Sequence, residues 1–160
     1  MNKMELRTRF LELLSSQRTG ALGTMSEQNW PYVSMTPFAI DTTSSTLVIH
    51  VSELGAHTRY LLKRSQASFM VCAREEPEAP VHALPRVTFQ VEAERLSPHT
   101  PAWATARDAY LGRFPDVGFM MEFTDFHLIA LNIVRVRQVN GFGAAKTLLE
   151  EDVRRWLASV

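Results

Sequence analysis

The sequence predicts a mainly β fold, a small β-barrel with helical decoration. Apolar runs of strand length recur along the chain and are bounded by turn residues. The segment 86–96 (RVTFQVEAERL) alternates apolar and polar residues, as a half-buried strand does. The segment 125–139 (DFHLIALNIVRVRQV) gives the longest strand pattern and is apolar on both faces. Such a strand is sandwiched, either in a core or against a partner chain.

The composition sets limits on the class of protein. With 160 residues the chain has the size of one domain, which we expect to span 1–160. Its 17 basic and 17 acidic residues cancel, so no strong overall field favours nucleic acid or a membrane surface as partner. Cys72 is the only cysteine, which excludes an intrachain disulfide and a multi-cysteine metal site. The N-terminus lacks the apolar core of a signal peptide, and no run reaches membrane-spanning length. These features predict a cytoplasmic protein.

The first elements are a helix and a hairpin. Residues 3–18 carry apolar side chains at helical spacing and predict an amphipathic helix. The segments 19–25 and 32–40, separated by a polar turn, predict a β-hairpin. Pro37 opposes helix and indicates an edge position or a bulge.

The chain is organised around the segment 46–64 (TLVIHVSELGAHTRYLLKR). Its first part predicts a buried strand, and its second part a basic amphipathic helix. Ser52 stands where an N-cap would, and the free amides of a first helical turn favour a phosphate or carboxylate. With His57, Thr58 and Arg59 in the next turn, the segment is a candidate anion cradle. The alternative is a capped helix whose basic face is merely solvated.

The remaining elements follow in order. The run 67–73 (ASFMVCA) predicts another buried strand, and the proline-rich, charged segment 74–85 predicts a loop. A helix is expected over about 101–114, because Ser97 or Thr100 can cap it and Pro115 follows it. Residues 140–143 (NGFG) predict a turn, and about 149–158 a terminal helix.

Common catalytic motifs are missing. The five histidines do not show the spacing of a helical zinc pair, so we expect no metal site. Ser34 lies in no G-x-S-x-G motif, and Gly141-x-Gly143 lacks the third glycine of a dinucleotide fingerprint. Spacing identifies no general acid or base. Chemistry could still come from a redox cofactor that the protein only positions.

Taken together, seven segments resemble the pyridoxamine 5′-phosphate oxidase-like, FMN-binding split-barrel superfamily, in particular its HugZ-type haem-utilisation branch. They follow one another in order over nearly the whole chain. They are GALGTM (20–25), PYVSMTPFAID (31–41), LVIHVSELGAHTRYLLK (47–63), RVTFQVEAERL (86–96), YLGRFPD (110–116), DFHLIAL (125–131) and GFGAA (141–145).

The resemblance implies a six-stranded antiparallel split barrel that forms a homodimer and holds FMN at the subunit interface. The protein would then be a flavoprotein oxidoreductase acting on a small substrate that the sequence does not identify. By position, the residues implied to line the flavin are Ser34, Met35, Thr36 and Pro37. Those implied to hold its phosphate are Ser52, His57 and Thr58, with Arg59 nearby, while Gln90 would reach the ring from the partner subunit.

Two alternatives stay open. The first is haem binding or degradation on the same scaffold. Haem-degrading members use a C-terminal histidine as iron ligand; here no histidine follows His127, so His127 or His82 would have to serve. The second is a cofactor-free dimeric binding module. Vitamin B6 oxidation itself is disfavoured, because His57 stands near the position of the family's phosphate-binding lysine.

Overall fold

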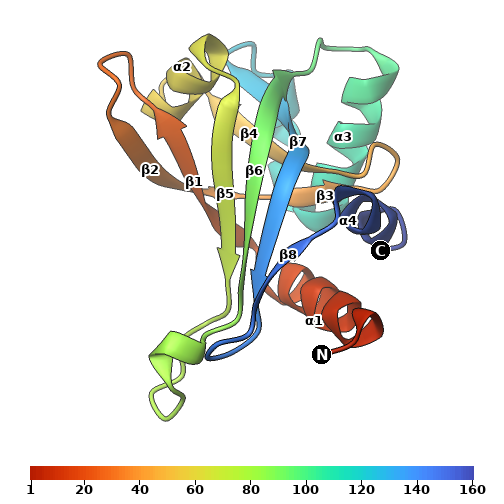
Figure 1. Ribbon diagram of the computed structural model, residues 1–160. Helices are drawn as coiled ribbons and strands as arrows, with labels where there is room; N and C mark the ends of the chain where they lie inside the picture. The colour runs from red at the N-terminus through yellow and green to blue at the C-terminus, as the bar shows by residue number, and fades with distance from the viewer.

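One antiparallel sheet of eight strands runs through the computed structural model, which describes residues 1–160 (Figure 1). Its spatial order is β2-β1-β5-β6-β7-β4-β3, and β8 pairs with β7. The curled sheet and its helices confirm the predicted mainly β split barrel. The strands are β1 (Thr19–Met25), β2 (Pro31–Pro37), β3 (Ala39–Asp41), β4 (Thr46–Ser52), β5 (Gln66–Cys72), β6 (Arg86–Arg95), β7 (Phe126–Val139) and β8 (Ala145–Leu148).

Four α-helices and two 3-10 helices accompany the sheet. The α-helices are α1 (Lys3–Ser16), α2 (Ala56–Lys63), α3 (Pro101–Arg113) and α4 (Glu150–Leu157), and the 3-10 helices are η1 (Val81–Ala83) and η2 (Pro115–Glu122). The Asn2 side chain accepts from the Glu5 amide in a capping box that begins α1. Thr100 caps α3, as expected, with Pro101 in the first turn. No helix is long and apolar enough to cross a membrane.

The sheet has two strands more than the six expected. The segment 32–40 divides at the buried Phe38, because β2 pairs with β1 whereas β3 pairs with β4. After the turn at 140–143 the chain returns along β7 as β8 before α4 begins. Both additional strands are short, and tertiary pairing rather than local apolar pattern defines them.

The barrel interior is the main core. Side chains of β1, β4, β5, β6 and β7 fill it, and apolar residues of α1 and α4 pack against them. A second, smaller core lies on the opposite face of β4 and β7, under α3, and its cluster includes Val48, Leu128 and Trp103. Both faces of β7 are therefore covered within the chain over its first half, as its sequence pattern predicted, whereas Val134 in the second half is exposed. The same arrangement gives β4 an inner and an outer face.

Candidate functional site

The junction between β4 and α2 carries the main candidate site, near one end of the sheet (Figure 1). The structure places the N-cap of α2 at Gly55 and not at Ser52. Ser52 instead accepts a hydrogen bond from the Leu54 amide at 3.2 Å. The expected cap is corrected because the chain makes a turn between strand and helix, which moves the first helical residue to Ala56. His57 then lies in the first turn of α2.

A hydrogen bond joins this first turn to the edge strand β2. The Ser34 hydroxyl lies 2.8 Å from His57 Nδ1. Ser34 pairs with Leu22 of β1, whose side chain is buried in the core, so Ser34 faces the inner side of the sheet toward α2. Burial lowers the pKa of His57 below its ordinary value of 6.5, because desolvation disfavours the imidazolium. The ring is therefore neutral near pH 7.

The second ring nitrogen of His57 is free. Nε2 has no hydrogen-bond partner in the chain, and it lies against Gly55. A Cβ on Gly55 would stand 2.9 Å from Nε2, so only a glycine leaves room beside this nitrogen. The bond at Nδ1 sets the tautomer. If Nδ1–H donates to Ser34, Nε2 presents a lone pair; if the Ser34 hydroxyl donates, Nε2 presents an N–H.

Two threonine hydroxyls near this pair are buried without a partner. Thr36 follows Ser34 on the same face of β2, and Thr58 follows His57 in α2. Their Oγ1 atoms have neither solvent contact nor a hydrogen-bond partner. Buried hydroxyls are nearly always satisfied in folded proteins, so this pair is unusual. We call Ser34, Thr36, His57 and Thr58 the cradle.

Other predicted site residues lie elsewhere. Met35 points to the outer face of β2 and is 64% exposed, and Gln90 is exposed on the outer face of β6. Ser52 lies two residues after His50 on β4 and so shares the outer face of that strand with it. Arg59 is exposed and forms no ion pair, and Pro37 ends β2 half-buried. Within one chain, then, the predicted residues do not form one continuous site.

Gln90 instead belongs to a groove on the outer face of the sheet, with a volume of about 450 Å³. We call it the outer groove. Its apolar lining includes Val33 of the edge strand β2, which is 69% exposed, and Val134, which is 53% exposed. Apolar side chains exposed around a groove are typical of an interaction surface.

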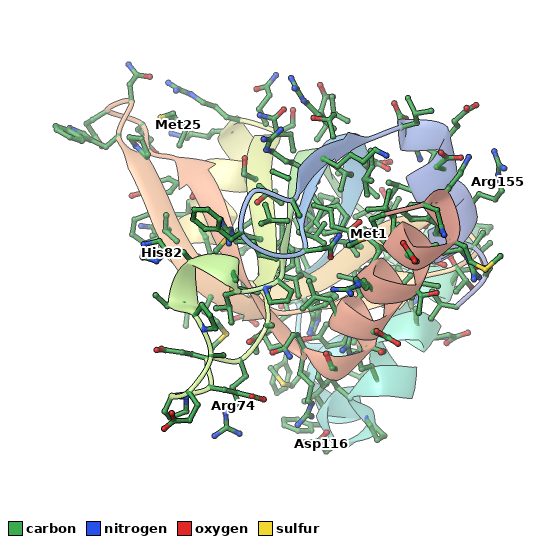
Figure 2. All side chains as sticks on the ribbon, turned by 60° about the horizontal axis from the view of Figure 1, so that its bottom comes forward. Met1, Met25, Arg74, His82, Asp116 and Arg155 are labelled. Atoms are coloured by element: carbon green, nitrogen blue, oxygen red, sulfur yellow. The ribbon has the colours of Figure 1, made fainter.

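The two histidines suggested as haem ligands are placed differently. His82 lies on η1, toward the opposite end of the sheet from α2 (Figures 1 and 2). His127 is only 5% exposed, and its Nε2 lies 2.6 Å from Glu53 Oε1. Neither ring offers an open nitrogen beside the cradle.

Sequence reasoning missed His50 and Gly55. His50 interrupts an apolar strand, and that interruption was the available signal. Gly55 carried no signal without its neighbours, because its importance depends on where the His57 ring lies.

The fold is that of a split-barrel protein whose strand-to-helix junction carries the candidate site. The family model of pyridoxamine 5′-phosphate oxidase matches residues 6–140, and the chain belongs to this family. It is 26% identical over 143 residues to the protein named heme oxygenase HutZ of Vibrio cholerae, covering 89% of this chain and 80% of that one. The superfamily expected from the sequence is thereby confirmed, and the similarity to HutZ agrees with the expected HugZ-type branch.

Two solved structures share the fold. One is titled a heme binding protein from Mycobacterium smegmatis; it is 26% identical, with a TM-score of 0.82 and 97% of this chain covered. The other is Campylobacter jejuni ChuZ, 22% identical, with a TM-score of 0.81 and 95% of this chain covered. This chain spans 61% and 62% of the length of those two chains.

Proposed function

We propose that this protein binds haem, with His57 as the ligand that the chain itself supplies to the iron. The observation that carries the proposal is the Ser34–His57 hydrogen bond at 2.8 Å, which leaves Nε2 of the same ring without a hydrogen-bond partner beside Gly55. Histidines that bind metals commonly donate the other ring N–H to an acceptor, which fixes the ring and raises its basicity. Ser34 is placed to be that acceptor, and burial keeps the imidazole neutral as ligation requires. The two relatives at 26% identity, one named a haem oxygenase and one a haem-binding protein, support this choice.

We further propose that the chain acts as a homodimer joined through the outer face of β2, β1, β5 and β6. β2 is an edge strand, and it presents Val33 and Met35 to solvent beside the outer groove. Covering these side chains removes apolar surface from water. Such a dimer would bring Gln90 of one subunit toward the cofactor of the other. The predicted residues that are separate within one chain would then belong to one site.

FMN is the second candidate, and the unsatisfied hydroxyls favour it. Thr36 and Thr58 are buried donors without acceptors, and a phosphate is an acceptor of several hydrogen bonds. The other tautomer of His57 would add an Nε2–H donor, while Arg59 at the surface adds positive charge. When bound, FMN would supply hydride or electron transfer to a small substrate. The cradle residues would hold and orient it.

Titration of the purified protein with hemin and, separately, with FMN tests the proposal. We expect hemin to bind and give a sharp Soret band. His57→Ala should lower the affinity for hemin by about 100-fold or more, because the variant removes the iron ligand itself. His82→Ala is the matched control, because that histidine lies on η1 and should leave binding unchanged. Quenching of FMN fluorescence on titration, without a Soret band from hemin, would show that the protein binds flavin and not haem. No response to either ligand would favour a cofactor-free binding module.

A further inference from the structure

A second cavity lies on the outer face of β4 and β7, beneath α3 and η2, with a volume of about 140 Å³. We call it the His50 cavity. Its walls include the side chains of Trp103, Met121, Phe126 and Leu128. Because it lies on the outer face of β4, it is separate from the cradle, whose residues lie on the inner side of β2 and on α2.

His50 is the polar group of this cavity. Among the five histidines only His57 and His127 form side-chain hydrogen bonds, so both ring nitrogens of His50 lack a partner. Its ring is held by Phe126 and Tyr110, at centroid distances of 5.1 and 5.6 Å. Burial, aided by the nearby His127, lowers the pKa of His50 to about 4. The imidazole is therefore neutral and able to donate one hydrogen bond and accept another.

The rim of the cavity carries charge. Arg95 lines it and takes part in none of the six ion pairs of the chain. His99 also lines it, with a φ of 65° and its ring 5.3 Å from that of Trp103. Glu122 is the acidic residue at the rim, and it too is unpaired. The guanidinium can bind a carboxylate in bidentate fashion, whereas Glu122 opposes one.

We propose that the His50 cavity binds a monocyclic aromatic carboxylate. An apolar protein cavity of about 150 Å³ accepts benzene, so this volume matches a single six-membered ring. The ring packs among Phe126, Trp103 and Met121, as aromatic groups do in offset or edge contacts. His50 hydrogen-bonds a polar ring atom or the acid group, and Arg95 pairs with the carboxylate. The site lies apart from the cradle, so it does not depend on the haem proposal.

Benzoate and phenol are the probes, followed by ligand-observed saturation-transfer NMR and by thermal stabilisation of the whole chain. We expect benzoate to bind at concentrations below about 10 mM. Arg95→Gln should weaken benzoate by about tenfold or more and leave phenol unchanged, because only benzoate carries the charge that Arg95 binds. Glu122→Gln should tighten benzoate, because it removes the opposing carboxylate.

Three controls separate this site from others. Arg107→Gln removes a half-buried arginine that stacks on Trp103 but does not line the cavity, and it should leave benzoate binding unchanged. His57→Ala should also leave it unchanged, which separates the cavity from the cradle. Met121→Trp should fill the space and abolish binding. Equal weakening by Arg95→Gln and Arg107→Gln, loss of binding in His57→Ala, or no benzoate binding at all would overturn the proposal.

Discussion

His50 and His57 lie on the same strand-to-helix segment and are both neutral, yet their rings are held in different ways. Ser34 hydrogen-bonds His57, which fixes one nitrogen and leaves the other without a partner beside Gly55. His50 is held by aromatic neighbours, with no hydrogen bond to either nitrogen. Burial is the first cause of the lowered pKa in both.

The difference teaches what each ring can do. A hydrogen bond at one nitrogen selects a tautomer, so His57 suits a ligand with a strict direction, such as a metal ion or a phosphate oxygen. Aromatic packing fixes the plane of the His50 ring but not its tautomer, so His50 suits a ligand chosen by shape. The two faces of one segment therefore support two kinds of recognition.

After His57→Ala itself, the largest expected effect comes from Gly55→Ala, which tests the role of His57 Nε2. The added Cβ would stand 2.9 Å from His57 Nε2 and must cover it or displace the ring from Ser34. Gly55 has a φ of −75°, so alanine fits its backbone and the fold should persist. We expect hemin affinity to fall by about 100-fold. This is the upper end of the loss in metal affinity seen when a residue next to a metal ligand is mutated.

Hemin titration with circular dichroism measures that loss alongside retention of the fold. Gly112→Ala is the matched control, because a Cβ there meets nothing within 4 Å. Unchanged hemin affinity in Gly55→Ala would show that Nε2 of His57 is not the ligand. Benzoate binding should survive the substitution, which keeps the two histidine sites distinct.

The pH dependence of stability gives the next largest effect and tests the burial of His50. The pKa of His50 is about 4 in the folded chain, below the ordinary 6.5 of the unfolded chain. As pH falls, the unfolded chain therefore takes up the proton at a higher pH than the folded chain does. Stability contributed by the neutral ring is therefore complete above about pH 6.5 and is lost as pH falls toward 4. Because the ring is partly solvated, we expect that loss to be on the order of 1 kcal/mol.

Urea unfolding of the parent and of His50→Gln at about pH 7 and about pH 5 isolates this contribution. The variant should lose less stability between the two pH values than the parent does. His82→Gln, a substitution on η1, should behave like the parent. Identical pH dependence in the parent and His50→Gln would contradict burial as the cause.

The sequence predicted more of the fold than of the candidate site. Alternating and apolar runs predicted the main strands, and the β4–α2 junction followed from apolar spacing alone. The contact between Ser34 and His57 did not, because it depends on how β2 pairs with β1 and on where α2 packs. The position of His50 under α3 was equally hidden, since an apolar strand does not reveal which face a helix will cover. The shift of the cap from Ser52 to Gly55 reflects a turn that no local pattern distinguished.

The smallest expected effect distinguishes the two cofactors at the cradle. The Thr58 hydroxyl is buried without a partner, and valine has nearly the same shape. Thr58→Val should therefore stabilise the apo protein by up to about 1 kcal/mol, because it removes an unsatisfied polar group. If that hydroxyl binds a phosphate, the same substitution weakens FMN binding. If the cradle binds haem through His57, hemin affinity stays the same.

Urea unfolding measures the change in stability, and titrations with FMN and with hemin measure the two affinities. Thr36→Val on β2 tests the other buried hydroxyl in the same way. A stability loss in Thr58→Val would show that the hydroxyl has a hydrogen-bond partner in solution, and the argument for a phosphate at this position would fail.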